Sequence, residues 1–338
     1  MKQTLFSFLL ISAIGLASCR KDRIQLSIKQ YDQQQILKYI AAQGITGMQR
    51  DLTGGDTSGI YYKIINPGTQ SINGTPVTPL DYPDKIAFVY TIRTLDGTFV
   101  QTDTIANHFY DFVGHIYSDH LPFGLQTAVH NLLKYPDASM RVLIPSHLAY
   151  GVSGTGSGSS TIANNKIAGN ESLDYYIHAV NNFNAYDDLV IKNYMTANSL
   201  TSYVQSMKIP VPGPLEPIVY WPGKSSHVPD SATYYYKVLT PGTGTSAITE
   251  SSNVTATLTG QIFNGSIFYQ YNTSGGYSFD VNSLLTPVQD GLINHAKVAG
   301  AKISFLIPSS LGYGMAGSSG IPPFSCLRFT WDVLTVTP

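Results

Sequence analysis

The feature that most constrains this chain is an internal duplication. Residues 186–194, YDDLVIKNY, repeat residues 31–39, YDQQQILKY, and both ends of the match lie 155 positions apart (186 − 31 and 194 − 39). Residues 235–238, YYKV, repeat residues 61–64, YYKI, in the same order along the chain. Units this long and this few do not make a solenoid. The chain must therefore hold two tandem copies of one domain, which a length of 338 residues permits.

Each copy is expected to begin with a short leader helix. In the first copy, Ile36, Leu37 and Ile40 recur on one face at helical spacing. Asp32 is the expected N-cap, because a short acidic side chain can accept from the first free backbone N–H groups. Gly44 is a candidate stop signal for this helix.

The carboxyl-terminal stretch, residues 304–337, predicts a strand, a turn, a glycine-rich flap, a Pro-Pro turn and a final strand. From Leu327 to Val333 apolar and polar residues alternate, which is the period of a half-buried strand. Pro322-Pro323 removes two backbone donors and therefore belongs at a strand entrance and not within a ladder. The first part of this stretch, residues 307–314, is matched by residues 144–151 in the first copy.

This stretch resembles the carboxyl-terminal part of FKBP-type peptidyl-prolyl cis-trans isomerases. The family pattern is I-P-x-x-L-x-Y-G, a short flap, I-P-P and then L-x-F-x-V-x-L, and it appears here in residues 307–314, 321–323 and 327–334. The resemblance implies an α+β fold with two tandem FKBP-like domains, each a twisted antiparallel sheet around a short helix and preceded by a leader helix. We expect a signal peptide at 1–18, a tether and leader helix at 19–55, a divergent first domain at 56–182, a second leader helix and Pro-rich linker at 183–230, and a second domain at 231–338.

The family's pocket residues carry over to the second domain where positions match. The resemblance gives a catalytic role to Tyr313, Phe329, Phe268, Ile321 and Leu285, the last through its backbone N–H. Several substrate-binding positions depart from the family: a tyrosine is replaced by Leu258, an aspartate by Tyr269 and the pocket-floor tryptophan by Val288. The remaining expected substrate contacts are Phe279 and Tyr277.

The first domain departs differently from the family pattern. Its possible pocket residues are Tyr90, Phe99, Leu125, Tyr150 and Tyr175. Pro122 falls where the family needs a backbone N–H donor, and proline has none; a shift of one residue would put Leu121 there instead. The flap between residues 151 and 166 is also enlarged. We expect a weaker or non-catalytic unit.

The chemistry that the resemblance implies needs neither a cofactor nor a metal. Rotation about X–Pro crosses a barrier of roughly 18–20 kcal/mol, and a dry aromatic slot favours the twisted amide, which has lost its resonance, over the planar one. A metal site among His108, His115 and His120 is the alternative, but their spacing fits no common ligand pattern.

The amino-terminal residues predict export. Lys2 and the apolar run from Leu5 to Leu16 form a signal segment too short to span a bilayer as a helix. The run ends in LASC, which resembles a bacterial lipobox and would make Cys19 the lipidated residue; an ordinary signal peptide with a chance cysteine is the alternative. A net charge of −1, with 12% charged residues and no basic face, gives no support for a nucleic-acid partner.

Together these observations predict a lipid-anchored isomerase of the bacterial cell envelope, a tandem-domain lipoprotein similar to those of Bacteroidetes. Its partners would be proline-containing polypeptides and, through the anchor on Cys19, a membrane. Activity is expected mainly in the second domain, in the folding of exported proteins. The alternative is a non-catalytic protein of the same fold, acting as a peptide-binding chaperone or in a surface assembly.

Overall fold

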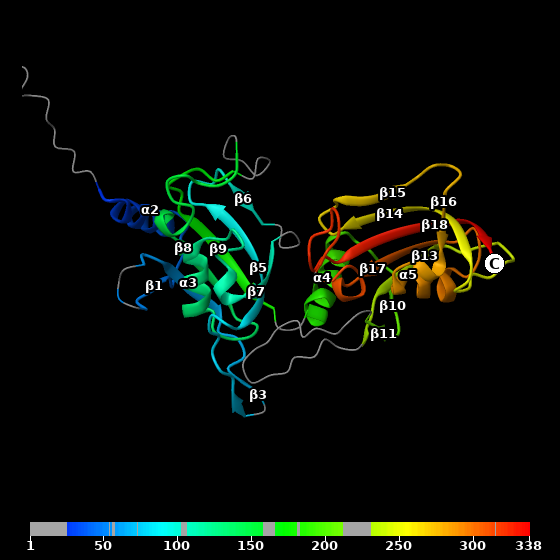
Figure 1. Ribbon diagram of the computed structural model, residues 1–338, viewed down its shortest axis with the longest axis horizontal. Coiled ribbons are helices and arrows are strands. Elements are labelled where there is room, and N and C mark those ends of the chain that lie inside the picture. The colour runs from blue at the N-terminus through cyan, green and yellow to red at the C-terminus, as the bar shows by residue number, and fades with distance from the viewer. Residues whose placement is uncertain are drawn as a thin grey trace, which may run out of the picture.

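A computed structural model gives the fold as two domains joined in sequence (Figure 1). Cys19 and the greater part of the expected Pro-rich linker lie outside the described residues. Within the described part of the chain, no helix is both long and apolar enough to cross a membrane. The described residues are 26–53, 55, 58–72, 74–102, 107–157, 166–180, 183–211, 231–314 and 316–338.

The first domain is a seven-stranded antiparallel sheet with a short helix, α3 (Phe123–Leu132), against it. A minor hairpin, β3 (Ser71–Ile72) with β4 (Thr75–Pro76), stands apart from the sheet. The order of the sheet is β1 (Gln49–Arg50), β2 (Tyr61–Asn66), β8 (Ser139–Ile144), β9 (Leu173–Ala179), β5 (Lys85–Thr94) and β6 (Val100–Gln101), with β7 (His108–Phe112) also on β5.

The second domain repeats this topology strand for strand. Its helix α5 (Thr286–Gly291) continues into a π-helical turn, Leu292–Ala296, and β11 (Ile209–Pro210) pairs with β12 (Ser231–Ala232) beside the sheet. The α+β class and the two tandem copies predicted from the sequence are therefore confirmed. The order is β10 (Val204–Gln205), β13 (Tyr235–Thr240), β17 (Lys302–Ile307), β18 (Leu327–Thr337), β14 (Asn253–Ile262) and β15 (Ile267–Tyr271), with β16 (Tyr277–Asp280) on β14.

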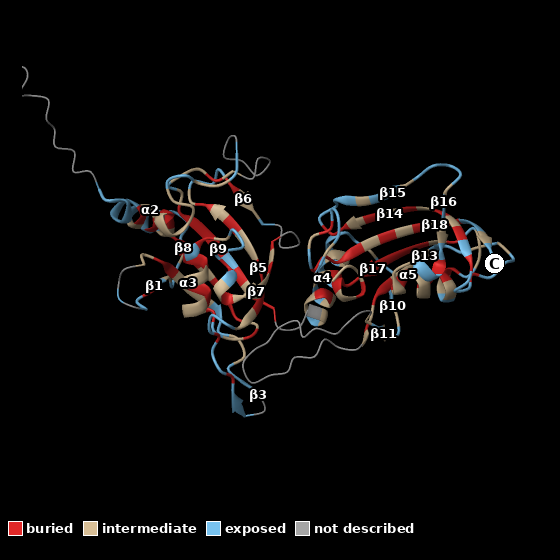
Figure 2. Cartoon of the chain, in the orientation of Figure 1, coloured by how far each residue is buried: buried red, intermediate tan, exposed pale blue. Residues whose placement is uncertain are grey.

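The main core of each domain lies between the sheet and its short helix. From Leu327 to Val333 in β18 every second residue is buried, as the sequence predicted. β14 alternates in the same way from Val254 to Ile262. The alternation is visible as red bands along the strands in Figure 2. Burying one face of each strand fixes the register, because a slip of one residue would expose the whole apolar set.

The leader helices, α2 (Ile28–Ala42) and α4 (Phe183–Ala197), pack against the other side of each sheet. Ile36 of α2 is fully buried with Tyr61 and Leu143, and Ile191 of α4 is fully buried with Leu306 and Cys326. The free Cys326 therefore lies off the main core face and is buried under a helix. Burial raises the pKa of its thiol, which keeps it protonated.

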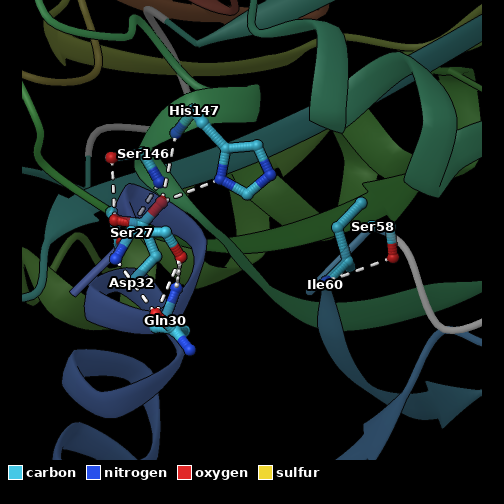
Figure 3. Close-up of polar contacts among 8 residues, drawn as sticks. Ser27, Gln30, Asp32, Ser58, Ile60, Ser146 and His147 are labelled. Carbon is cyan, nitrogen blue, oxygen red and sulfur yellow. Dashed lines mark hydrogen bonds and ion pairs between the residues drawn. The ribbon is translucent and has the colours of Figure 1, made fainter.

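The predicted N-cap of α2 is wrong. Ser27 caps the helix in a reciprocal capping box with Gln30. Asp32 lies one turn further on and is 1% exposed. Its carboxylate instead accepts hydrogen bonds from Ser146 Oγ at 2.8 Å and from the backbone N–H of His147 at 3.3 Å, and lies 2.8 Å from the imidazole Nδ1 of His147 (Figure 3). The aspartate thus ties the leader helix to the turn after β8.

Candidate functional site

Eight of the ten site residues predicted in the second domain meet in one apolar cluster. Phe268 lies edge-on to Phe329 and to Tyr313, with ring centroids 5.5 and 6.5 Å apart and interplanar angles of 82° and 85°. Perpendicular rings are a favoured aromatic arrangement. Phe329 is itself buried, and the residues buried in the same cluster include Ile321, Leu258 and Val288. Leu285 and Phe279 are partly buried and pack against it.

A β-bulge sets the direction of Phe268. Gly260 pairs with Tyr269 but the next residue of β14 pairs with Ile267, so Phe268 is an extra residue on β15. Gly260 also gives the rings room: a Cβ there would lie 2.6 Å from ring atoms of both Phe268 and Phe329. This role of Gly260 could not be inferred from the sequence, because it depends on how β14 pairs with β15 and β18.

The tyrosines at the edge of this site are open to solvent. Tyr269 is 37% exposed and Tyr277 is 41% exposed, so each keeps a large part of its side chain outside the cluster. Tyr271 lies between them, with ring centroids 6.0 Å from Tyr269 and 4.7 Å from Tyr277. Burial, and then the nearby Tyr269 hydroxyl, raise the pKa of Tyr313, which therefore remains a protonated donor at neutral pH.

A buried indole lies two residues from Phe329 on the same face of β18. Trp331 is 2% exposed and packs against Phe279 at a centroid distance of 5.0 Å. Its Nε1 has no hydrogen-bond partner within the described residues. The cluster thus contains an indole, although the expected tryptophan position on the helix is occupied by Val288.

The residue that precedes the short helix differs between the domains. Leu285 is the N-cap of α5, and its carbonyl accepts from Val288 and Gln289. Pro122 is the N-cap of α3, with almost the same backbone angles, φ −61° and ψ 143° against −56° and 138°. The register that put Pro122 at the donor position is therefore the one observed. The first domain lacks the N–H that Leu285 carries outside the helical ladder.

In the first domain, four of the five predicted residues line one cavity of about 350 Å³. Tyr175 pairs with Ile92 as Phe329 pairs with Gly260, so the two aromatic positions correspond. The fifth predicted residue, Leu125, is fully buried in the core and is not among those that line the cavity. The four that line it are Tyr90, Phe99, Tyr150 and Tyr175.

The cavity has further walls that the sequence did not suggest. They include Asn107, Asp119 and His120, which stand in or next to loops whose placement only the fold determines. In the described part of the chain, this cavity included, no group of three or more His, Cys, Asp or Glu residues is arranged to hold a metal ion.

The comparisons with known proteins bear mainly on the second domain. Residues 244–334 match the family model of FKBP-type peptidyl-prolyl cis-trans isomerases. The isomerase FkpA of Escherichia coli strain K12 is 36% identical over 104 residues, which is 30% of this chain and 37% of that protein. The chain thus spans little more than a third of the curated relatives it matches.

Two solved structures are similar to larger parts of the chain. The three FKBP domains of wheat FKBP73 cover 86% of this chain and 99% of their own, at 17% identity and a TM-score of 0.30. FkpA from Escherichia coli covers 46% of this chain and 61% of its own, at 27% identity and a TM-score of 0.33.

Proposed function

Because residues 244–334 belong to the FKBP-type peptidyl-prolyl cis-trans isomerase family, we propose that the second domain catalyses rotation about X–Pro bonds. The observation that carries the proposal is the perpendicular arrangement of Phe268 with Tyr313 and Phe329 above a buried apolar floor. A prolyl ring enters such a site with its amide removed from water, and a protonated Tyr313 hydroxyl can donate to a substrate carbonyl.

Catalysis by this site is differential binding. The planar X–Pro amide is strongly dipolar and well hydrated, while the twisted transition state has lost its resonance and much of that dipole. Moving the amide from water to an apolar aromatic wall therefore costs less free energy in the transition state than in the ground state. The uncatalysed step takes on the order of 10–100 s, so even modest stabilisation is measurable in refolding.

A proline-limited refolding assay with the full chain tests this function. The wild type should accelerate refolding, and Phe329→Ala should reduce kcat/KM by about tenfold or more through loss of the aromatic wall. Tyr313→Phe should reduce it less, because a single hydrogen bond is lost. Tyr150→Phe, at the corresponding position of the first domain, is the matched control and should leave the rate unchanged. A wild-type rate equal to buffer would rule the activity out.

A second candidate is peptide holding without catalysis. Val288 stands in place of the expected floor tryptophan, and Tyr269 in place of the expected aspartate, which favours retained binding with reduced chemistry. This alternative expects suppression of aggregation of an unfolded client with no change in refolding rate. The same preparation can be measured in both assays, so the two functions are separable.

We further propose that the clients are exported proteins and that lipid on Cys19 anchors the chain in the bacterial envelope. The support is the apolar amino-terminal segment that ends in LASC. Metabolic labelling with a clickable fatty acid should mark the wild type and not Cys19→Ala. Equal labelling of both would contradict the anchor.

A further inference from the structure

The flap of the second domain, which follows Tyr313, closes on a residue that its backbone conformation does not favour. Phe324 has a φ of +56°, in the left-handed region that bulky side chains rarely adopt. Its backbone N–H donates to the carbonyl of Gly314 at 2.9 Å, so this turn joins the two ends of the flap. Local preference does not explain a phenylalanine here, and the reason must lie outside the turn.

The first domain contains the same turn with a different residue. Asn170 has a φ of +60°, and its backbone N–H donates to the carbonyl of Gly151 at 2.8 Å. Asn170 is exposed, and asparagine is one of the few residues besides glycine that adopt this conformation readily. The turn therefore closes a flap without an aromatic ring, and the ring of Phe324 serves a purpose that the first domain's flap does not share.

That ring packs into the other domain. Phe324 is 4% exposed and belongs to the hydrophobic core cluster of the first domain. Its ring lies edge-on to Tyr110 of β7, with centroids 5.7 Å apart. The residue before it is held as well, because Nδ1 of His108, also in β7, donates to the carbonyl of Pro323 at 2.9 Å. Burial of the ring in the first domain offsets the unfavourable backbone conformation.

The docked residue is tied to the aromatic site of the second domain by backbone hydrogen bonds. Ile321 of that site exchanges two of them with Ser318, at 2.8 and 2.9 Å. The bond from Phe324 to Gly314 holds the flap next to Tyr313, another residue of the site. Fixing one end of this loop in the first domain therefore restrains two site residues. A loop that is ordered before a ligand arrives loses less entropy on binding.

We propose that the first domain acts as a scaffold that holds the flap of the second domain in its binding conformation. Phe324 is then a positioning residue, which acts through Ile321 and Tyr313 and does not itself contact the polypeptide. The inference rests on the isomerase function proposed for the second domain. It gives the first domain a role that needs no activity of its own.

Phe324→Asn in the full chain tests the proposal, because it gives this turn the residue that the first domain has at Asn170. The turn should remain while the docking is lost. In the proline-limited refolding assay KM should rise by about three- to tenfold, with kcat within about twofold of the wild type. Amide hydrogen exchange at Ser318 and Ile321, followed by NMR, should become about tenfold faster or more. Phe123→Asn, at a ring that is 47% exposed, is the matched control and should change neither.

A second pair of variants tests the contact from the first domain. His108→Leu removes the donor to Pro323 and should raise KM in the same direction, while His108→Asn keeps a donor near the Nδ1 position and should restore most of the affinity. A KM unchanged in Phe324→Asn and His108→Leu, or a loss of kcat at constant KM as for a smaller folded fraction, would overturn the proposal. A wild type without isomerase activity would instead refute the function of the second domain. The exchange rates of Ser318 and Ile321 would then still decide whether the first domain holds the flap.

Discussion

The imidazole Nδ1 of His108, in the first domain, donates a hydrogen bond to the backbone carbonyl of Pro323, in the second domain, across 2.9 Å. The next residue, Phe324, is 4% exposed and belongs to the hydrophobic core cluster of the first domain. Its ring lies edge-on to His108 and Tyr110, at 5.9 and 5.7 Å. Ile321 belongs to the aromatic site of the second domain, and the loop that carries it thus contacts the first domain.

This contact predicts a stability effect that crosses the domain boundary. Phe324→Ala should destabilise the full chain by roughly 2–4 kcal/mol, because a buried aromatic ring is lost from the first core. Differential scanning calorimetry should show the first domain melting several degrees lower. Phe123→Ala removes the same side chain where it is 47% exposed and should have a much smaller effect. Equal shifts for the two variants would contradict the domain contact.

The second leader helix predicts a pH dependence of stability. Asp187 Oδ2 accepts from the backbone N–H and hydroxyl of Ser309, at 2.8 and 2.6 Å, as Asp32 binds the corresponding turn. Burial raises the pKa of Asp187 to about 7, because its effect is larger than that of these hydrogen bonds, which lower the pKa. The native state therefore binds a proton that the unfolded chain has already released, and stability falls as pH rises from the unfolded value of 3.8 to about 7.

Urea unfolding across this range measures the effect. The contribution of Asp187 should fall by up to about 1.4 kcal/mol per pH unit and level off above the folded pKa. Asp187→Asn cannot titrate and supplies the control. The difference in unfolding free energy between wild type and variant should shrink towards high pH. A constant difference would show that the carboxyl is ionised throughout.

The sequence predicts features that depend on residues close together in the chain or on its internal repeat, but not features that depend on contacts made only in the folded structure. The 155-residue offset and the alternation in β14 and β18 are patterns within the chain, so the tandem sheets and their buried faces were predictable. Asp32 was misassigned because a buried partner after β8 cannot be seen from a capping pattern. Gly260 was missed because a β-bulge brings Phe268 against it. Asn107 was missed because the fold of a loop places it at the cavity of the first domain.

The close approach at Gly260 gives a third prediction. Gly260→Ala would put a Cβ 2.6 Å from ring atoms of Phe268 and Phe329, so both rings must move. Isomerase activity should fall by about tenfold, with a stability loss of roughly 1–3 kcal/mol from overpacking. The matched control is Gly275→Ala in the same domain, where an added Cβ meets nothing within 4 Å. Undiminished kcat/KM for Gly260→Ala would show that the ring arrangement is not needed.

The last prediction concerns a substitution that gives the second domain the proline found at the same position of the first domain. Leu285 has φ −56°, within the range that proline adopts, and Pro122 occupies the equivalent N-cap without disturbing α3. Leu285→Pro should therefore keep the helix while removing one N–H donor. If that N–H binds the substrate carbonyl, kcat/KM should fall by roughly tenfold or more, which corresponds to a lost hydrogen bond in a dry site.

Leu285→Ile is the companion variant, because it keeps the N–H and most of the apolar surface. It should retain most of the activity, with circular dichroism and melting temperature close to those of the proline variant. Equal losses of activity in the two variants would assign the effect to the side chain and remove the backbone donor from the mechanism. Loss confined to Leu285→Pro would show that the backbone N–H takes part in catalysis, and would account for the weaker or absent activity expected of a domain with Pro122 at this position.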